Sequence, residues 1–325
     1  MPNSISLGLI ACVFAVAAAH APAIAHEVYV SSEKDNAVTV IDSASLEVVR
    51  TFPVGKRPRG IAFSKDLSQV YICASDSNAV QVYAADGTHL HDLPSGEDPE
   101  QFALSPDGKR LFIANEDNAV TTVVDLATKL VVAQVDVGVE PEGMAVSPDN
   151  RVAITTSETT NMAHVFDAAT LKSIANIPVP PRPRYARFTA DGSKLWVTSE
   201  IGGTVSIIDV ATWTIERTIR FKVDGVQTDK VQPVGLVFSR DGATAFVALG
   251  PANRVAAIDV ATGTVKSYIL VGQRVWHLAL ASDGHLFTTN GLSNDVTVID
   301  TATLKPLKSI KVGRYPWGIA IREAN

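Results

Sequence analysis

The stretch "VTVIDSASLEVVRTFPVGKRPRGIAFSKD" (residues 38–66) decides the fold, because it recurs along the chain. It returns as "TTVVDLATKLVVAQVDVGVEPEGMAVSPD" (121–149), and its first half returns as "VSIIDVATWTIERTI" (205–219). Alignment on the Asp of "VID" gives Asp42, Asp125, Asp167, Asp209, Asp259 and Asp300, with Tyr83 in one degenerate copy. The spacings are 41, 42, 42, 42, 50 and 41 residues, so the chain holds seven copies of one unit.

Each copy contains four short runs in which apolar and polar residues alternate. In the third copy these runs are "GMAVS" (143–147), "VAITTS" (152–157), "MAHVFD" (162–167) and "KSIANIPV" (172–179). Such runs, separated by Pro-Asp, Asp-Gly and Asn, are typical of antiparallel strands joined by hairpins. The sequence therefore predicts an all-β, seven-bladed β-propeller with four-stranded antiparallel blades.

The two ends of the repeat array predict how the ring closes. The array starts on "VYVSS" (28–32), which is the second strand of a unit, and ends on "WGIAIRE" (317–323), which is a first strand. We expect the C-terminal strand to pair beside the N-terminal one and complete a single blade. This closure would leave no open sheet edge between the first and last blades.

Residues 1–25 differ from the rest and predict a signal peptide. "SLGLIACVFAVAAAHAPAIA" (6–25) is apolar, and Ala23-Ile24-Ala25 fits a cleavage site before His26. The run is broken by His20 and Pro22, so no membrane anchor is expected after cleavage. Residues 26–325 would then form one propeller domain whose only cysteine is Cys73, which is typical of a periplasmic protein that needs no disulfide.

The charge balance bears on the partners. Twenty-eight Lys and Arg against 34 Asp and Glu give a net charge of −6. A nucleic-acid-binding protein usually carries a basic surface, so DNA and RNA are not expected partners.

Three strings carry a family resemblance. "VYVSSEKDNAVTVID" (28–42), "LWVTSEIGGTVSIIDVAT" (195–212) and "GIAFSKD" (60–66) resemble the YVTN-type β-propeller repeat family over essentially all of residues 28–325. Within that family the chain looks most like exported propellers associated with pyrroloquinoline-quinone-dependent alcohol catabolism. The resemblance implies an accessory role beside a quinoprotein dehydrogenase system, and it supplies no catalytic residue that can be transferred to this chain.

The order of the strands assigns the loops to two faces of the ring. The turns of the "SPDG" and "IDxAT" type share one face, here named the turn face, and they repeat almost unchanged. Asp and Gly suit such turns, which predicts a structural role. The loops that lead into the first strands and the loops between strands two and three share the other face, here named the approach face.

The approach face keeps its frame and changes its chemistry from blade to blade. After the proline of "VGxxPxG", or at the matching place, stand Arg59, Glu100, Glu142, Arg184, Val234, Trp276 and Trp317. One residue later stand Gly60, Gln101, Gly143, Tyr185, Gly235, His277 and Gly318. Because first strands line the channel of a propeller, we expect these side chains to converge at one mouth and bind a ligand or partner. The alternative is a rim of weakly paired, solvated charges.

Two further features fall on this face. "FKVDGVQTDKVQ" (221–232) lengthens one loop and is either a lid or partner contact, or a tolerated insertion. Arg187 occupies the place held elsewhere by Ala62, Ala103, Ala145, Ala279 and Ala320. A charge there needs a carboxylate partner or access to the channel. With Arg184 and Tyr185 it favours an anionic ligand.

Few residues of the chain fit the patterns of known cofactor, metal or nucleophile sites. Haem or copper chemistry needs more placed His or Cys than the chain offers, and no G-x-S-x-G motif or phosphate-binding loop is present. A calcium ion among Glu33, Glu116, Glu142 and Glu200 is an alternative to the absence of any cofactor.

The sequence thus favours a periplasmic, non-catalytic binding or accessory protein. Its site would be Arg59, Glu100, Glu142, Arg184, Tyr185, Arg187, Trp276, His277 and Trp317. Its partner would be a small anionic molecule or a quinoprotein dehydrogenase system. The enzymatic alternative is a lactonase-like hydrolase with His277 as base.

Overall fold

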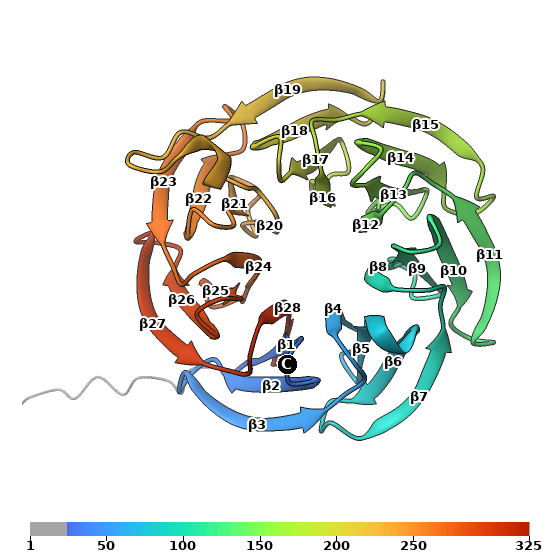
Figure 1. The fold of residues 1–325 in the computed structure, drawn as a ribbon, viewed down its shortest axis with the longest axis horizontal. Coiled ribbons are helices and arrows are strands. Elements are labelled where there is room, and N and C mark those ends of the chain that lie inside the picture. The colour runs from blue at the N-terminus through green and yellow to red at the C-terminus, as the bar shows by residue number, and fades with distance from the viewer. Residues whose placement is uncertain (1–24, 325) are drawn as a thin grey trace, which may run out of the picture.

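Seven four-stranded antiparallel sheets stand around a central axis, which confirms the predicted seven-bladed all-β propeller (Figure 1). The computed structural model describes residues 25–324, so the predicted signal peptide lies, apart from Ala25, outside the described residues. In that part of the chain the only helical segments are two 3₁₀ turns, Ser75–Ser77 and Thr228–Lys230. No helix among the described residues is long and apolar enough to cross a bilayer.

The blades follow one another along the chain, each running from the channel outward. After the closing blade, the next blade holds β4(Pro58–Phe63), β5(Gln69–Ala74), β6(Ala79–Ala84) and β7(His89–Pro94), and the one after it holds β8(Pro99–Leu104), β9(Arg110–Asn115), β10(Val120–Asp125) and β11(Leu130–Asp136). The following blade holds β12(Pro141–Val146), β13(Val152–Ser157), β14(Met162–Asp167) and β15(Ser173–Pro178). The fourth holds β16(Pro183–Phe188), β17(Lys194–Ser199), β18(Thr204–Asp209) and β19(Thr214–Arg220). The next two are β20(Leu236–Phe238), β21(Thr244–Ala248), β22(Arg254–Asp259) and β23(Val265–Leu270); β24(Val275–Leu280), β25(His285–Asn290), β26(Asp295–Asp300) and β27(Lys305–Lys311).

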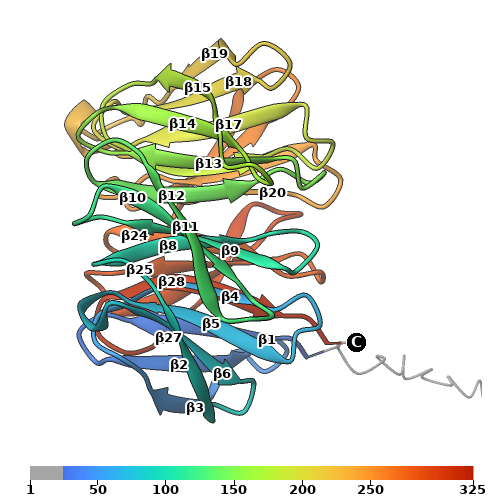
Figure 2. The same cartoon turned by 90° about the vertical axis from the view of Figure 1, so that its right-hand side faces the viewer.

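The remaining blade closes the ring in the predicted way. Its strands stand in the order β28(Pro316–Arg322), β1(Glu27–Ser32), β2(Ala37–Asp42) and β3(Glu47–Pro53). The register pairs Tyr29 with Ala320 and Val28 with Ile321. The two ends of the described chain leave from one face of the ring (Figure 2), where the Ala324 N–H donates to Nδ1 of buried His26 at 3.0 Å. The ring is therefore held by a strand pair and by a side-chain clasp.

Turn chemistry explains why the repeat holds its shape. The aspartate that recurs in the repeat caps the turn that follows it. For example, Asp125 Oδ1 accepts the Thr128 N–H at 2.8 Å. On the approach face, an asparagine of one blade tethers the loop of the next. Asn36 Oδ1 accepts the Arg57 N–H at 3.0 Å, and Asn253 Oδ1 accepts the Arg274 N–H at 2.8 Å. These tethers hold Arg57 and Arg274 at φ of 50° and 58°, a conformation that non-glycine residues seldom adopt.

Neighbouring first strands pass so closely that glycine is required at the crossing. A Cβ built on Gly318 would lie 2.3 Å from the Arg59 carbonyl oxygen. A Cβ on Gly143 would lie 2.8 Å from the Arg184 carbonyl oxygen. Both neighbours are backbone atoms, which cannot move aside without displacing a strand. The "G" of "PxG" is therefore a packing requirement between blades.

The substitution Gly318→Ala is expected to destabilise the fold by about 1–3 kcal/mol, the usual cost of overpacking. Gly108→Ala is the matched control, because no atom lies within 4 Å of its added Cβ and only its φ of +73° opposes the change. Urea unfolding of both variants checks the expectation. Equal midpoints for the two variants would contradict it.

Candidate functional site

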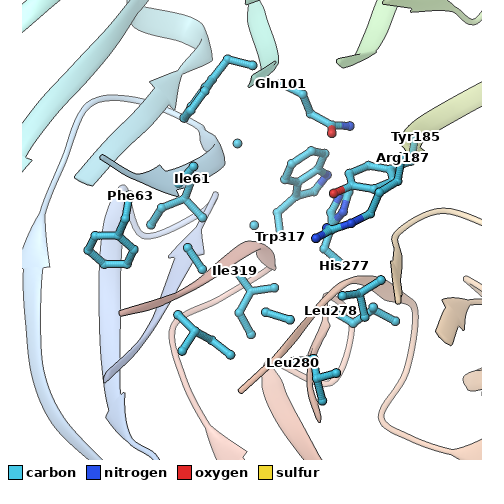
Figure 3. Close-up of a pocket in the computed structure, with 18 of the residues that line it drawn as sticks. Ile61, Phe63, Gln101, Tyr185, Arg187, His277, Leu278, Leu280, Trp317 and Ile319 are labelled. Carbon is cyan, nitrogen blue, oxygen red and sulfur yellow. The ribbon is translucent and has the colours of Figure 1, made fainter. Parts of the chain in front are cut away.

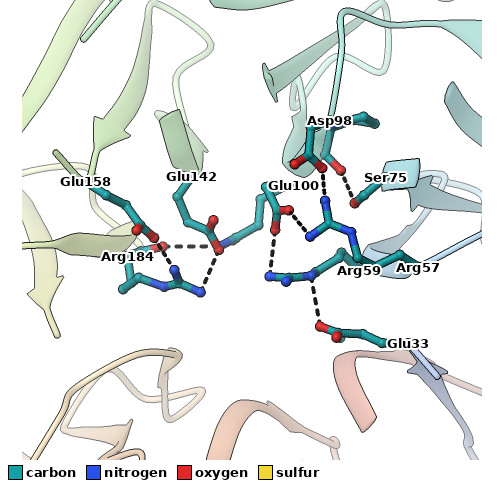
Figure 4. A network of polar contacts seen from close by, with 12 residues as sticks. Glu33, Arg57, Arg59, Ser75, Asp98, Glu100, Glu142, Glu158 and Arg184 are labelled. Atoms are coloured by element: carbon teal, nitrogen blue, oxygen red, sulfur yellow. Dashed lines mark hydrogen bonds and ion pairs between the residues drawn. The ribbon is translucent and has the colours of Figure 1, made fainter. Parts of the chain in front are cut away.

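The predicted residues of the approach face converge, and they form a buried ion-pair network. Arg59 Nη1 lies 2.7 Å from Glu100 Oε2, and Arg59 Nε lies 2.8 Å from Glu33 Oε1. Across the channel Arg184 Nη2 lies 3.1 Å from Glu142 Oε1, and Arg184 also pairs with Glu158 (Figure 4). The network brings residues of several blades to one end of the first strands.

A second set of residues extends the network outward. Arg182 Nε lies 2.7 Å from Glu158 Oε2, and Arg274 Nη2 lies 2.6 Å from Glu200 Oε1. Arg57 Nη1 lies 3.1 Å from Glu100 Oε1. The sequence analysis missed Arg57 and Arg274, although both, like Arg182, occupy the place before the strand-entering proline or its equivalent. That shared position in the repeat was the signal that could have found them.

Burial sets the electrostatics of this network. Glu100, Glu142 and Arg184 expose 0%, 1% and 4% of their surface. Burial raises the pKa of Glu100 well above its usual range, against the opposing effect of Arg59. Burial alone would lower the pKa of Arg184, but Glu142 and Glu158 raise it on balance. The network is therefore a set of buried, mutually paired charges, and it does not resemble the solvated rim of the alternative prediction.

The pKa of Glu158 is raised to about 7, chiefly by burial, with Arg184 opposing and Glu142 adding to the rise. A carboxyl whose pKa is raised in the folded state stabilises the fold below its unfolded pKa, and this contribution is lost as pH rises through the folded value. We expect the unfolding free energy of the protein to fall between about pH 4.5 and 7, and Glu158→Gln to flatten this fall. Thermal melts across this window check it. An unchanged slope in the variant would count against the assignment.

Both tryptophans of the predicted site lie against arginines of the network. The Trp276 ring centre is 4.0 Å from the guanidinium carbon of Arg274 and 5.6 Å from that of Arg184. The Trp317 ring centre is 5.1 Å from the guanidinium carbon of Arg59, and Trp317 is 1% exposed. These contacts are cation–π pairs, and they fix the network against the channel wall.

Next along the first strands, a glycine alternates with a larger residue around the ring. The positions are Gly60, Gln101, Gly143, Tyr185, Gly235, His277 and Gly318. Seven places cannot alternate fully, and Gly318 and Gly60 are the neighbouring pair of glycines. The three larger side chains and Trp317 come together below the ion pairs (Figure 3).

A cavity of about 440 Å³ occupies the channel from this level onward. It is lined by Tyr185, Arg187, His277 and Trp317 of the predicted site, and it continues to Ile321 and Glu323 at the far ends of the first strands. None of Arg59, Glu100, Glu142 and Arg184 lines it. The predicted residues thus divide into two groups. The charged group consists of Arg59, Glu100, Glu142 and Arg184, which pair with carboxylates or arginines. The cavity group consists of Tyr185, Arg187, His277 and Trp317, and the cavity that it lines extends toward the turn face.

His277 lies at the inner end of the cavity with an unusual environment. Its ring centre is 4.2 Å from that of Trp317 and 5.5 Å from that of Tyr185. Burial, with Arg184 and Arg59 adding to the effect, lowers its pKa to about 3. Its Nε2 has no hydrogen-bond partner, and neither has the Trp317 Nε1. Two buried polar atoms at one end of a cavity are therefore without partners in the described chain.

Arg187 reaches the channel, which is one of the two conditions stated for a charge in an alanine position. It is exposed and lines the cavity, and no carboxylate of residues 25–324 lies within 4 Å of its guanidinium. In the view of Figure 3 it projects into the same cavity as Tyr185 and His277. An unpaired guanidinium in a recess is a suitable group for an anion.

The remaining candidates have other environments. Phe221, Val223 and Val231 anchor the inserted segment in a hydrophobic cluster with Trp196 and Leu236, whereas residues 227–230 between them are exposed. Among the described residues, the carboxylates that approach within 4.8 Å of one another are Asp98, Glu100 and Glu116, a different set from the predicted calcium ligands. Arg57 pairs with two of these three residues, which already offsets much of their charge.

Comparisons with known proteins support the fold. The Cytochrome D1 heme domain family matches residues 100–187, and no curated protein matches. The periplasmic gluconolactonase PpgL of Pseudomonas aeruginosa superposes with a TM-score of 0.79 at 19% identity, covering 93% of this chain and all (100%) of that one. Hydrazine synthase of Kuenenia stuttgartiensis gives 0.75 at 20% identity, with 84% and 92% covered. The dihydro-heme d1 dehydrogenase NirN gives 0.66 at 16% identity, with 90% and 74% covered. The chain shares the propeller fold of these proteins.

Proposed function

We propose that this protein binds a small organic molecule in the cavity of its central channel and is not itself a catalyst. The observation that carries the proposal is the cavity group, in which one recess is lined by the exposed Arg187 guanidinium, which no described carboxylate pairs, and by Tyr185, His277 and Trp317. A recess with a few convergent polar groups is the usual form of a ligand site.

The proposal moves the site from where the sequence placed it. Sequence reasoning put the ligand at the mouth of the approach face, among nine residues of which Tyr185, Arg187, His277 and Trp317 line the cavity and the charged Arg59, Glu100, Glu142 and Arg184 do not. Those charges are buried and paired, so an anion bound there would have to displace carboxylates from arginines. The cavity group offers free donors without that cost.

The family resemblance adds a setting to this proposal. An exported propeller of this kind would act in the periplasm beside a quinoprotein dehydrogenase system for alcohol oxidation. The ligand would then be a molecule handled by that system, and the protein would hold or deliver it.

A lactone hydrolase is the second candidate, favoured by the shared fold with a gluconolactonase and by the imidazole in the cavity. His277 is neutral near pH 7 and so available as a base, but a pKa of about 3 makes it a weak one. Release of acid from gluconolactone by the wild type, lost in His277→Ala, would establish this candidate.

The matching family name raises haem as a ligand. Within residues 25–324, His277 is the only histidine that lines the cavity, and its ring is packed between Tyr185 and Trp317. A haem iron bound to Nε2 would require both rings to move, so the residues present do not fit a haem and we derive no step through one.

A cavity-filling variant tests the proposal. Ala279 lines the cavity, and Ala279→Trp should fill it, whereas Ala127→Trp places the same side chain on an exposed turn. We expect compounds from a panel of organic acids, alcohols, amines and lactones to raise the melting temperature of the wild type and of Ala127→Trp, but not of Ala279→Trp. Equal shifts in the folded plugged variant, or no shift of the wild type with any compound, would refute channel binding.

A further inference from the structure

The cavity has two unlike walls, and this difference indicates the class of its ligand. Polar side chains from β8, β16 and β24 lie on one side: Gln101, Tyr185, Arg187 and His277. Aliphatic and aromatic side chains from β4, β24 and β28 lie on the other side: Ile61, Phe63, Leu278, Leu280 and Ile319 (Figure 3). Phe102, Met144 and Val237 add further apolar lining. A ligand that satisfies both walls must itself be polar at one part and apolar at another.

The polar wall is composed mainly of donors. A guanidinium carries five N–H groups and no acceptor, and the Trp317 indole is a donor only. Neither has a partner among the described residues. The Gln101 amide nitrogen is already used, because it donates to the Arg184 carbonyl oxygen at 3.1 Å. The Arg187 guanidinium, the accessible donor of this wall, therefore favours a ligand that presents hydrogen-bond acceptors.

Charge favours an anion as the acceptor. Among the described residues that line the cavity, Arg187 is the one cation and Glu323 is the one carboxylate. Glu323 lies beyond the far end of the closing strand and pairs with Arg240 at 3.4 Å. A carboxylate accepts two parallel bonds from a guanidinium, and such charge-assisted pairs are roughly twice as strong as neutral ones. An ammonium group would meet an unpaired guanidinium and be repelled.

The apolar wall requires a hydrocarbon part. Its side chains line an open recess, and covering them removes apolar surface from water at about 25 cal/mol per Å². A volume of about 440 Å³ lies within the range of small-molecule sites, so it can hold more than a bare inorganic anion.

We propose that the channel binds an organic carboxylate with an apolar body, its carboxylate on Arg187 and its hydrocarbon part against β4, β24 and β28. This assignment rests on the proposed channel-binding function and adds the chemical class of the ligand. It places the protein after a reaction that forms carboxylates or before one that consumes them.

Matched six-carbon compounds test the assignment. Hexanoate, 1-hexanol and hexylamine share one hydrocarbon chain, and acetate retains only the carboxylate. Isothermal titration of the full chain is expected to give hexanoate at least about 10-fold tighter binding than each of the other three, the ratio that one charge-assisted bond supplies. Arg187→Met should weaken the binding of hexanoate by about 10-fold or more and leave the binding of 1-hexanol unchanged. Arg151→Met, at an exposed turn, should leave both unchanged.

The outcomes separate the two proposals. Tight binding of 1-hexanol or hexylamine that is abolished in Ala279→Trp would keep the channel site and overturn the carboxylate assignment. Hexanoate binding that survives Arg187→Met would do the same. Hexanoate binding that survives Ala279→Trp would refute the channel site itself.

Discussion

Removal of residues 316–325 is expected to destabilise the protein by at least about 5 kcal/mol, or to prevent folding altogether. The deletion removes β28, which pairs with β1 and carries buried Trp317. It also removes the hydrogen bond from the Ala324 N–H to His26 Nδ1. Strand β1 is then left as an open sheet edge that faces the channel. No other strand of the closing blade can take its place.

Thermal melts of the truncated and full chains check this expectation. The matched control is His26→Ala, which breaks the side-chain clasp and keeps the strand pair, and it should cost far less. A truncated chain that melts within a few degrees of the full one would show that the ring does not depend on this closure.

Replacement of Arg184 by Met is expected to cost about 3–5 kcal/mol, the usual loss when one partner of a buried ion pair is removed. Arg184 pairs with Glu142 and Glu158, and all three are buried. The variant leaves Glu142 without a cation and leaves Glu158 with Arg182 alone. Arg151→Met is the control, because its only ion pair, with Asp149, is exposed.

A compensated variant separates loss of charge balance from loss of packing. Arg184→Met combined with Glu142→Gln and Glu158→Gln removes the stranded charges and should recover part of the stability, as measured by urea unfolding. A triple variant no more stable than Arg184→Met, or a single variant as stable as Arg151→Met, would contradict the buried-network account.

The repeat predicted the fold in detail because a propeller is built from local rules. The period-two runs repeat in every blade and the capped turn of Asp125 in every blade but the one with Tyr83, so a departure in one copy does not hide the pattern. Ring closure followed from which strand stands at each end of the array. The sequence also identified Arg187, because a charge in a position otherwise held by alanine departs from the pattern.

The division of the site could not be predicted from the repeat. Arg184 and Arg187 stand three residues apart, yet one is buried among carboxylates and the other lines a cavity. That difference depends on which side chains of other blades lie opposite, and Glu158 and Glu200 come from loops whose positions only the closed ring defines. The partnerless nitrogens of His277 and Trp317 are likewise properties of packing between blades.

The central claim is that the channel cavity holds an organic anion on Arg187. The most direct measurement is a crystal structure of the protein with hexanoate. The account predicts a carboxylate within hydrogen-bond distance of the Arg187 guanidinium, with the carbon chain against Leu280 and Ile319. Hexanoate bound among Arg59, Glu100 and Arg184 on the approach face, with the channel free of ligand, would contradict it.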